Sequence, residues 1–164
     1  MKTLIDYIPK SQRIISIEDV EELVFSEHGN YVQLFYPSEA KNTDFLNATT
    51  LLKSCLRMKP DRIVLAELRG GETFDFINII NSGHGGSITS CHAGSVAETF
   101  SRLELMTLQN ESGQKIPYEV IQSTLKNTID VVIHMADTDN GRRITEVYYK
   151  DFDELKKNKK EDKV

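Results

Sequence analysis

The sequence predicts an α/β fold in which helices flank a mostly parallel β-sheet, with an antiparallel hairpin near the C-terminus. Short apolar runs alternate with segments of helical spacing, which is typical of strand–helix–strand units. Proline or glycine stands between several of these segments, where elements are expected to end. Two strand-like runs, 130–136 and 142–149, are joined by a short turn, which favours an antiparallel pair.

The size and charge of the chain set limits on its class. At 164 residues it is long enough for one domain with a proper core. Hydrophobic and charged fractions of 39% and 27% are those of a folded globular protein. Because the net charge is −5, we expect no specific nucleic-acid recognition by this chain.

Signals of membrane or secreted proteins are missing from the sequence. No apolar run approaches the roughly 20 residues that span a bilayer, and Asp6 interrupts the apolar N-terminus, unlike a signal peptide. Cys55 and Cys91 lack CxxC spacing, which indicates free thiols in a reducing compartment. We therefore expect a cytoplasmic domain over residues 1–150 and a charged, flexible tail over residues 151–164.

The chain is expected to begin with a short helix followed by two strands. Residues 4–8 have helical spacing, and Pro9 ends that segment. Residues 13–19 form an isoleucine-rich run that is too short for a helix, which favours a buried strand. Residues 31–36 combine aromatic and branched side chains and predict a second strand.

A longer helix is expected next. Thr43 or Asp44 can cap it. Pro60 ends it, because proline lacks an N–H and disfavours helical backbone in the residue before it. The face expected to be buried consists of Phe45, Ala48, Leu52 and Cys55.

The middle of the chain repeats the strand–helix pattern. A buried strand at residues 63–66 leads directly to Glu67. A helix follows and ends before Gly83, and residues 87–92 form the next strand. The inner face of that helix is marked by Phe74, Ile77 and Ile80.

Two more helices and the hairpin are expected in the C-terminal part. Ser95 and Glu98 form a capping box at the start of the first helix. A loop at residues 109–115 separates it from a second helix with Pro117 in its first turn. The inner faces of the two helices consist of Phe100, Leu103 and Met106, and of Tyr118, Ile121 and Leu125.

Carboxylates at the ends of two predicted strands are the main chemical signal. Glu18 and Asp19 end one strand and Glu67 follows another. In open α/β sheets, ligands bind outside the carboxyl ends of the strands, and carboxylates there can hold Mg²⁺ or orient a water for attack on a phosphate. The alternative is that they solvate the sheet edge or cap the next element.

A glycine- and histidine-rich segment is the second signal. Glycines at residues 83–86 let backbone approach a ligand closely, and His84 or His92 can sense a phosphate. The alternative is a tight turn with ordinary surface histidines. A zinc site from these histidines and Glu67 is less favoured, because the ligand spacing of known zinc sites is missing.

Arginine is the usual partner of phosphate charge, and one arginine stands out. Arg69 lies two residues beyond Glu67 and has the best position of the four arginines near these motifs, which are Arg57, Arg62, Arg69 and Arg102. The alternative is that these arginines merely pair with nearby acids at the surface. None of the nine glycines belongs to a GxxxxGK[ST] sequence, so the usual phosphate-binding loop is not among these residues.

Three segments together resemble the C-terminal half of VirB11-type ATPases, the hexameric traffic motors of type IV secretion. They read RIISIEDVEEL, LLKSCLRMKPDRIVLAELRGGE and SGHGGSITSCHAGS, in the family's order. The resemblance runs from about Ile5 to about Tyr149 and implies a RecA-like fold of the P-loop NTPase type. Residues 13–19 then match the Asp box, 59–67 the Walker B strand and 83–95 the His box.

The resemblance also implies roles for individual residues. Glu18 and Glu67 would share Mg²⁺ coordination and activation of the water that attacks ATP, with the assignment between them open. His92 would sense the γ-phosphate or couple its loss to movement between subunits, with support from His84. The implied catalytic residues are Glu18, Glu67 and His92, and the implied nucleotide- or magnesium-binding residues are Glu18, Asp19, Glu67, Arg69, His84 and His92; no zinc site is expected. Ala66 stands where family members usually carry glycine.

The family's P-loop would lie just before the first helix, so the chain looks like a motor core truncated before the Walker A strand and loop. We therefore do not expect appreciable ATP turnover by these residues alone. The resemblance implies a homohexamer in the complete protein, association with other secretion components at the inner membrane, and a cytoplasmic, peripheral location. The alternative is a truncated, non-catalytic paralogue that acts as an interaction or assembly module.

Overall fold

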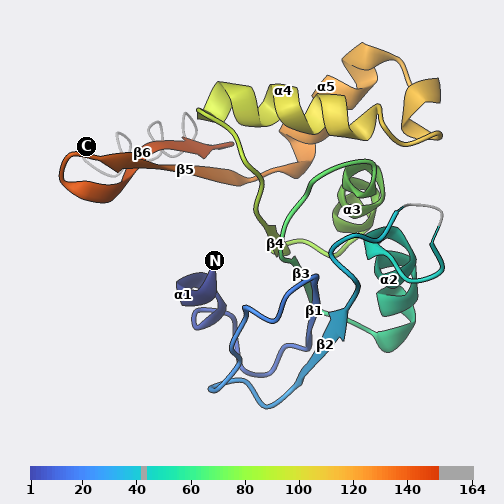
Figure 1. Ribbon diagram of the computed structural model, residues 1–164, viewed down its shortest axis with the longest axis vertical. Coiled ribbons are helices and arrows are strands. Elements are labelled where there is room, and N and C mark those ends of the chain that lie inside the picture. The colour runs from blue at the N-terminus through green and yellow to red at the C-terminus, as the bar shows by residue number, and fades with distance from the viewer. Residues whose placement is uncertain (42–43, 152–164) are drawn as a thin grey trace, which may run out of the picture. The chain divides into compact units, whose positions relative to one another are not determined.

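The computed structural model describes residues 1–41 and 44–151 (Figure 1). The chain divides into two compact units. The first contains residues 1–91 and 106–115, and the second contains residues 92–105 and the chain from 116 onward. Within the described residues, no helix is both long enough and apolar enough to cross a bilayer.

A four-stranded parallel sheet forms the centre of the first unit. Its strands, in the order β2-β1-β3-β4, are β2 (Tyr31–Phe35), β1 (Ile14–Glu18), β3 (Arg62–Leu65) and β4 (Ile88–Thr89). All five residues of β1 are buried, as expected for a central strand covered on both faces. Because the strands are parallel, their carboxyl ends share one edge of the sheet. The predicted α/β fold with a parallel sheet is confirmed.

Helices cover both faces of this sheet (Figure 1). On one face, α1 (Lys2–Ile5) contributes to a core cluster that includes Ile14 of β1 and Val64 of β3. On the other face, α2 (Ala48–Cys55) contacts both β1 and α3 (Glu72–Asn81). Two short 3₁₀ turns, η1 (Leu56–Met58) and η2 (Gly113–Lys115), complete the unit.

The predicted start of α2 was wrong. Asn47 is the N-cap: its side chain accepts from Thr50 N at 2.9 Å, and the Thr50 hydroxyl accepts from Asn47 N at 3.1 Å. Asp44 instead accepts from the amide of Lys41, and Thr43 lies outside the described residues. Phe45 therefore precedes the helix and is 96% exposed, whereas it was predicted to be buried.

The inner face and the end of α2 agree with the prediction. Leu52 and Cys55 are fully buried, and burial raises the pKa of the Cys55 thiol to about 11. The helix ends through η1, and Lys59 adopts a left-handed conformation immediately before Pro60.

Strand β4 is shorter than predicted, two residues instead of the six at 87–92. Its last pair joins Thr89 to Leu65, which is also the last residue of β3. Beyond that point β3 offers no further partner, so the chain leaves the ladder at Ser90.

The second unit contains most of α4 (Val96–Thr107), together with α5 (Tyr118–Thr128) and the hairpin of β5 (Val131–Thr138) and β6 (Gly141–Tyr149). The antiparallel hairpin is confirmed. Ser95 Oγ accepts from Glu98 N at 3.1 Å, which caps α4, while the Glu98 carboxylate accepts from Gly94 N. Phe100 of α4 packs edge-on against Tyr148 of β6.

Candidate functional site at the carboxyl edge of the parallel sheet

Polar side chains from three neighbouring strands meet at the carboxyl edge of the sheet. Asp19 follows β1, Tyr36 follows β2, and Glu67 lies two residues beyond β3. Backbone hydrogen bonds continue past the strand ends, from Tyr36 N to Glu18 O at 3.1 Å and from Ala66 N to Ile17 O at 2.9 Å. The sheet pairing thus positions these side chains beside one another.

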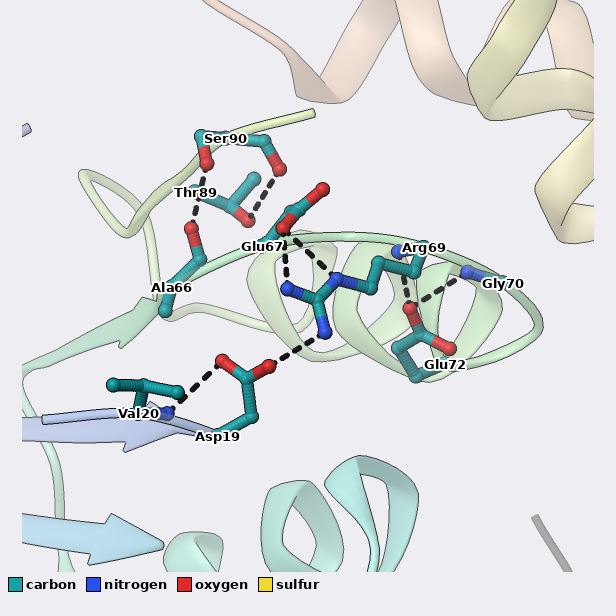
Figure 2. Close-up of polar contacts among 9 residues, drawn as sticks. All are labelled: Asp19, Val20, Ala66, Glu67, Arg69, Gly70, Glu72, Thr89 and Ser90. Carbon is teal, nitrogen blue, oxygen red and sulfur yellow. Dashed lines mark hydrogen bonds and ion pairs between the residues drawn. The ribbon is translucent and has the colours of Figure 1, made fainter. Parts of the chain in front are cut away.

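Arg69 joins two of these carboxylates (Figure 2). Its Nε donates to Glu67 Oε2 at 2.9 Å, and its Nη2 forms an ion pair with the same oxygen at 2.8 Å. Its Nη1 donates to Asp19 Oδ2 at 2.5 Å. Half of the Arg69 side chain is exposed, against 21% for Glu67 and 10% for Asp19. One guanidinium therefore connects the ends of β1 and β3 from the solvent side.

The loop that carries Glu67 and Arg69 is held by hydrogen bonds on both sides of them. Glu72, at the start of α3, accepts from the amides of Arg69 and Gly70 at 2.6 and 2.8 Å. Ser90, just past β4, donates its hydroxyl to Ala66 O at 2.6 Å (Figure 2). The Ser90 carbonyl accepts from Leu68 N at 2.8 Å. The backbone of residues 66–70 is therefore fixed by two different elements.

The same loop also contacts the segment at residues 106–115. A Cβ on Gly71 would lie 3.3 Å from the backbone nitrogen of Asn110, so glycine permits the close approach. The Asn110 side chain donates to Gly71 O at 3.1 Å.

Electrostatics at this edge affect two groups. The hydrogen bonds that Arg69 donates to Glu67 and Asp19 raise its pKa, which keeps the guanidinium charged. Burial and the negative charge of Asp19 raise the pKa of Tyr36 to about 12. Tyr36 is therefore neutral at physiological pH.

Glu18 occupies a different environment from Asp19, although the two are adjacent in sequence. It is 0% exposed and accepts from the amides of Glu22 and Leu23, both at 2.9 Å. Ser16 Oγ and Gln33 Nε2 donate to its other oxygen at 2.7 and 3.2 Å. Glu18 thus holds the segment after β1 from inside the first unit.

The two histidines lie in different places. His84 is half-buried, with Nδ1 3.2 Å from Ile79 O, in a turn that precedes β4. Gly86 of that turn accepts from Arg62, the first residue of β3, so the turn lies at the amino edge of the sheet, opposite Glu67. His92 is exposed and belongs to the second unit.

The structure therefore brings Glu18, Asp19, Glu67 and Arg69 together at one edge, and His84 is not with them. Tyr36 and Glu72 also belong to this edge and were missed. Tyr36 stands directly after a predicted strand, as Asp19 and Glu67 do after theirs, and that position was the available signal. Glu72 is an acid at the start of a helix, where carboxylates commonly accept hydrogen bonds from backbone amides.

The edge is suited to Mg²⁺ only with help from other ligands. Across the described residues, no cluster of three or more histidine, cysteine or carboxylate side chains could hold a metal ion alone. Asp19 and Glu67 offer the oxygen atoms that Mg²⁺ prefers, and Mg²⁺ commonly takes one or two carboxylates and completes its shell with water and phosphate oxygens. As placed, Glu18 uses both oxygens for hydrogen bonds inside the unit.

Sequence comparisons identify relatives of the whole chain. The profile of the family described as Type II/IV secretion system protein matches residues 1–159. The chain is 58% identical over 154 residues to the Type IV secretion system protein VirB11 of Brucella suis. The aligned segment covers 91% of this chain and 43% of that relative. The chain is also 42% identical over 156 residues to the Type IV secretion system protein PtlH of Bordetella pertussis. That alignment covers 92% of this chain and 46% of PtlH.

Solved structures of related proteins also resemble this chain. The crystal structure of the VirB11 ATPase from the Brucella suis type IV secretion system in complex with sulphate matches with a TM-score of 0.84 and 56% identity, covering 90% of this chain and 43% of that one. The pilus retraction motor PilT with bound ADP shares the fold, with a TM-score of 0.62 at 23% identity and coverage of 90% and 42%. The chain thus spans less than half the length of the relatives that it matches.

Proposed function

Because the chain belongs to the Type II/IV secretion system protein family, in its VirB11 branch, we propose that it is the motor-core portion of an ATPase that powers type IV secretion. The observation that carries the proposal is the placement of Glu67. This carboxylate lies just beyond the buried strand β3, beside Asp19 from the neighbouring strand. Ligands of α/β sheets bind at that edge.

Glu67 is the residue that we propose for the central chemical role. It would orient or deprotonate the attacking water, or hold Mg²⁺ directly or through water. Bound Mg²⁺ would supply charge neutralisation of the phosphates. Because Glu18 is enclosed and uses both oxygens to hold neighbouring groups, we assign it to support of the site, and assign contact with the metal and water to Glu67 and Asp19.

The roles that we propose for the two histidines and the P-loop rest on the family to which the chain belongs. We propose that His92 senses the γ-phosphate, and that His84 supports the histidine-containing segment through its turn rather than by contact at the Glu67 edge. The P-loop that binds most of the phosphate charge would come from outside these 164 residues. We further propose that the complete protein is a homohexamer on the cytoplasmic side of the inner membrane, where it associates with other secretion components.

The proposal is tested in a graft in which this chain replaces the matching segment of Brucella suis VirB11, a protein of family length. We expect Mg²⁺-dependent ATP hydrolysis by the graft and a loss of at least ~100-fold in kcat for Glu67→Gln, because the neutral amide cannot accept a proton. Glu111→Gln is the matched control, since Glu111 is exposed and outside the site. Unchanged turnover in Glu67→Gln would defeat the assignment.

A second candidate is an assembly module without catalysis. The observation in its favour is that Arg69 already pairs with both Asp19 and Glu67, the two acids that we assign to the metal and water. A folded graft that assembles like Brucella suis VirB11 but does not hydrolyse ATP would support this candidate over the first.

A further inference from the structure

We propose that Arg69 is a positioning residue for Glu67, which it holds against Asp19, and that it does not bind the phosphates itself. This inference rests on the proposed function and refines it. It differs from the role that the sequence suggested, in which Arg69 binds nucleotide or Mg²⁺.

The contacts of the guanidinium support positioning. All three of its nitrogens face carboxylates: Nε and Nη2 face Glu67, and Nη1 faces Asp19. A guanidinium presents its N–H groups in a fixed planar fork, so binding both acids at once sets their relative orientation. The two acids neutralise the charge of the guanidinium, which lowers its attraction for a phosphate, although N–H groups of Nη1 and Nη2 remain outside these contacts.

Hydrogen bonds hold the backbone of Arg69 in place, so its side chain extends from a fixed position. Its amide donates to Glu72, and the preceding residue, Leu68, is buried and donates to Ser90. Neither Glu72 nor Ser90 belongs to the strands that carry Asp19 and Glu67. The guanidinium therefore ties the end of β1 to a loop that β4 and α3 have already fixed.

The charges at the edge show what Arg69 prevents. Asp19 and Glu67 are acids that bind one guanidinium, and Tyr36 is neutral. Without Arg69, the carboxylates of Asp19 and Glu67 would lose the guanidinium that both bind, and their like charges would repel. We therefore expect the Glu67 side chain to be held less precisely, although its backbone stays in place.

The test uses the graft defined above and separates kcat from nucleotide affinity. For Arg69→Gln we expect kcat to fall by ~10–100-fold, since a displacement of about 1 Å costs this much in an oriented reaction, while the Kd for ADP changes by less than about threefold. Arg142→Gln is the matched control: it makes the same substitution in an exposed ion pair with Asp137 and should leave both quantities unchanged. Thermal unfolding checks that each variant folds.

Two further variants make the test decisive. Arg69→Lys keeps the charge but cannot bridge both acids, so we expect a fall in kcat of at least about fivefold with unchanged ADP affinity; it replaces Arg69→Gln if that variant does not fold. Asp19→Asn should lower kcat in the wild-type graft and lower it by a smaller factor in Arg69→Gln, because the part of its effect that acts through Arg69 is already lost there.

The outcomes distinguish this inference from the proposed function. A loss of ADP affinity of tenfold or more with kcat retained makes Arg69 a phosphate ligand and overturns the inference, while hydrolysis that depends on Glu67 still supports the function. Wild-type kcat in both Arg69 variants also overturns it. A graft without Glu67-dependent hydrolysis overturns the function and the inference together.

Discussion

At the scale of single residues, two adjacent acids lie in different environments because strand side chains alternate between faces. Glu18 is the last residue of β1 and shares a face with Ser16 and Ile14, so it points toward the core beneath α1. Asp19 comes one residue later and is available to Arg69. The pair shows how one step along the backbone separates a structural carboxylate from one at the site.

The internal role of Glu18 can be tested in the 164-residue chain. In Glu18→Gln, the amide can accept from Glu22 and Leu23, but its NH₂ then faces the NH₂ of Gln33. We expect the free energy of unfolding to fall by about 1–3 kcal/mol, since a buried charge-assisted hydrogen bond is lost.

Urea unfolding measures this change. Glu21→Gln is the control, because Glu21 is exposed and its substitution should alter the free energy of unfolding by less than about 0.5 kcal/mol. Equal unfolding midpoints for the two variants would contradict the role given to Glu18.

At the scale of elements, the turn between α3 and β4 depends on one glycine of an adjacent pair. Gly86 has φ of +73°, and a Cβ there would lie 1.7 Å from Arg62 Nη1, which itself donates to Gly86 O. Gly85, its neighbour, has open space around the position of a Cβ. Gly86 thus lets the start of β4 approach the start of β3.

The difference in the space around Gly85 and Gly86 predicts that only one of two matched substitutions lowers stability. Gly86→Ala should lower the free energy of unfolding by about 1–2 kcal/mol, because the left-handed backbone disfavours a Cβ and the Arg62 guanidinium must move. Gly85→Ala should stay within about 0.5 kcal/mol of the wild type. Chemical denaturation of the two variants side by side gives the comparison, and equal stabilities would refute the role of Gly86.

The hairpin shows how a register shift preserves an apolar face. Six half-exposed apolar side chains form three cross-strand pairs: Val131 with Tyr149, Ile133 with Val147, and Met135 with Ile144. The register shifts between His134 and Met135, which leaves Thr145 without a position in the ladder. Without that shift, Met135 would lie opposite Thr145, so the bulge keeps the apolar side chains on one face.

At the scale of the whole molecule, the chain supplies one part of the nucleotide site that we propose. The acids and Arg69 gather at the carboxyl edge, and no P-loop sequence is present among the 164 residues. In P-loop NTPases, that loop and its lysine cradle the β- and γ-phosphates. The affinity for ATP should therefore be low for these residues by themselves.

Calorimetric titration of the 164-residue chain with ATP and Mg²⁺ tests this expectation. We expect a Kd weaker than ~1 mM, which is about 4 kcal/mol of binding free energy or less. The graft with Brucella suis VirB11 is the positive control, since it supplies the remaining part of a family-length protein. Micromolar binding by the 164-residue chain would show that its own residues supply the phosphate contacts.

Much of the fold could be predicted from local patterns. The ranges predicted for β1, β2, β3 and both hairpin strands agree with the structure to within one or two residues. These predictions came from apolar runs, helical spacing and the positions of prolines. These signals are local, because each strand or helix carries its own apolar period. The cap of α2 was wrong because Asn47, Asp44 and Thr43 are all good caps, and local chemistry does not rank them. The length of β4 was wrong because it depends on where its partner, β3, ends.

By itself, the sequence determined the family, the order of the elements and the acids at the strand ends. Only the tertiary structure decided which acid points inward, which side chain binds Arg69, and that His84 lies at the edge opposite Glu67. The physical reason is distance along the chain. Arg69 and Asp19 are 50 residues apart, so their contact depends on the pairing of β1 with β3 and on no local pattern.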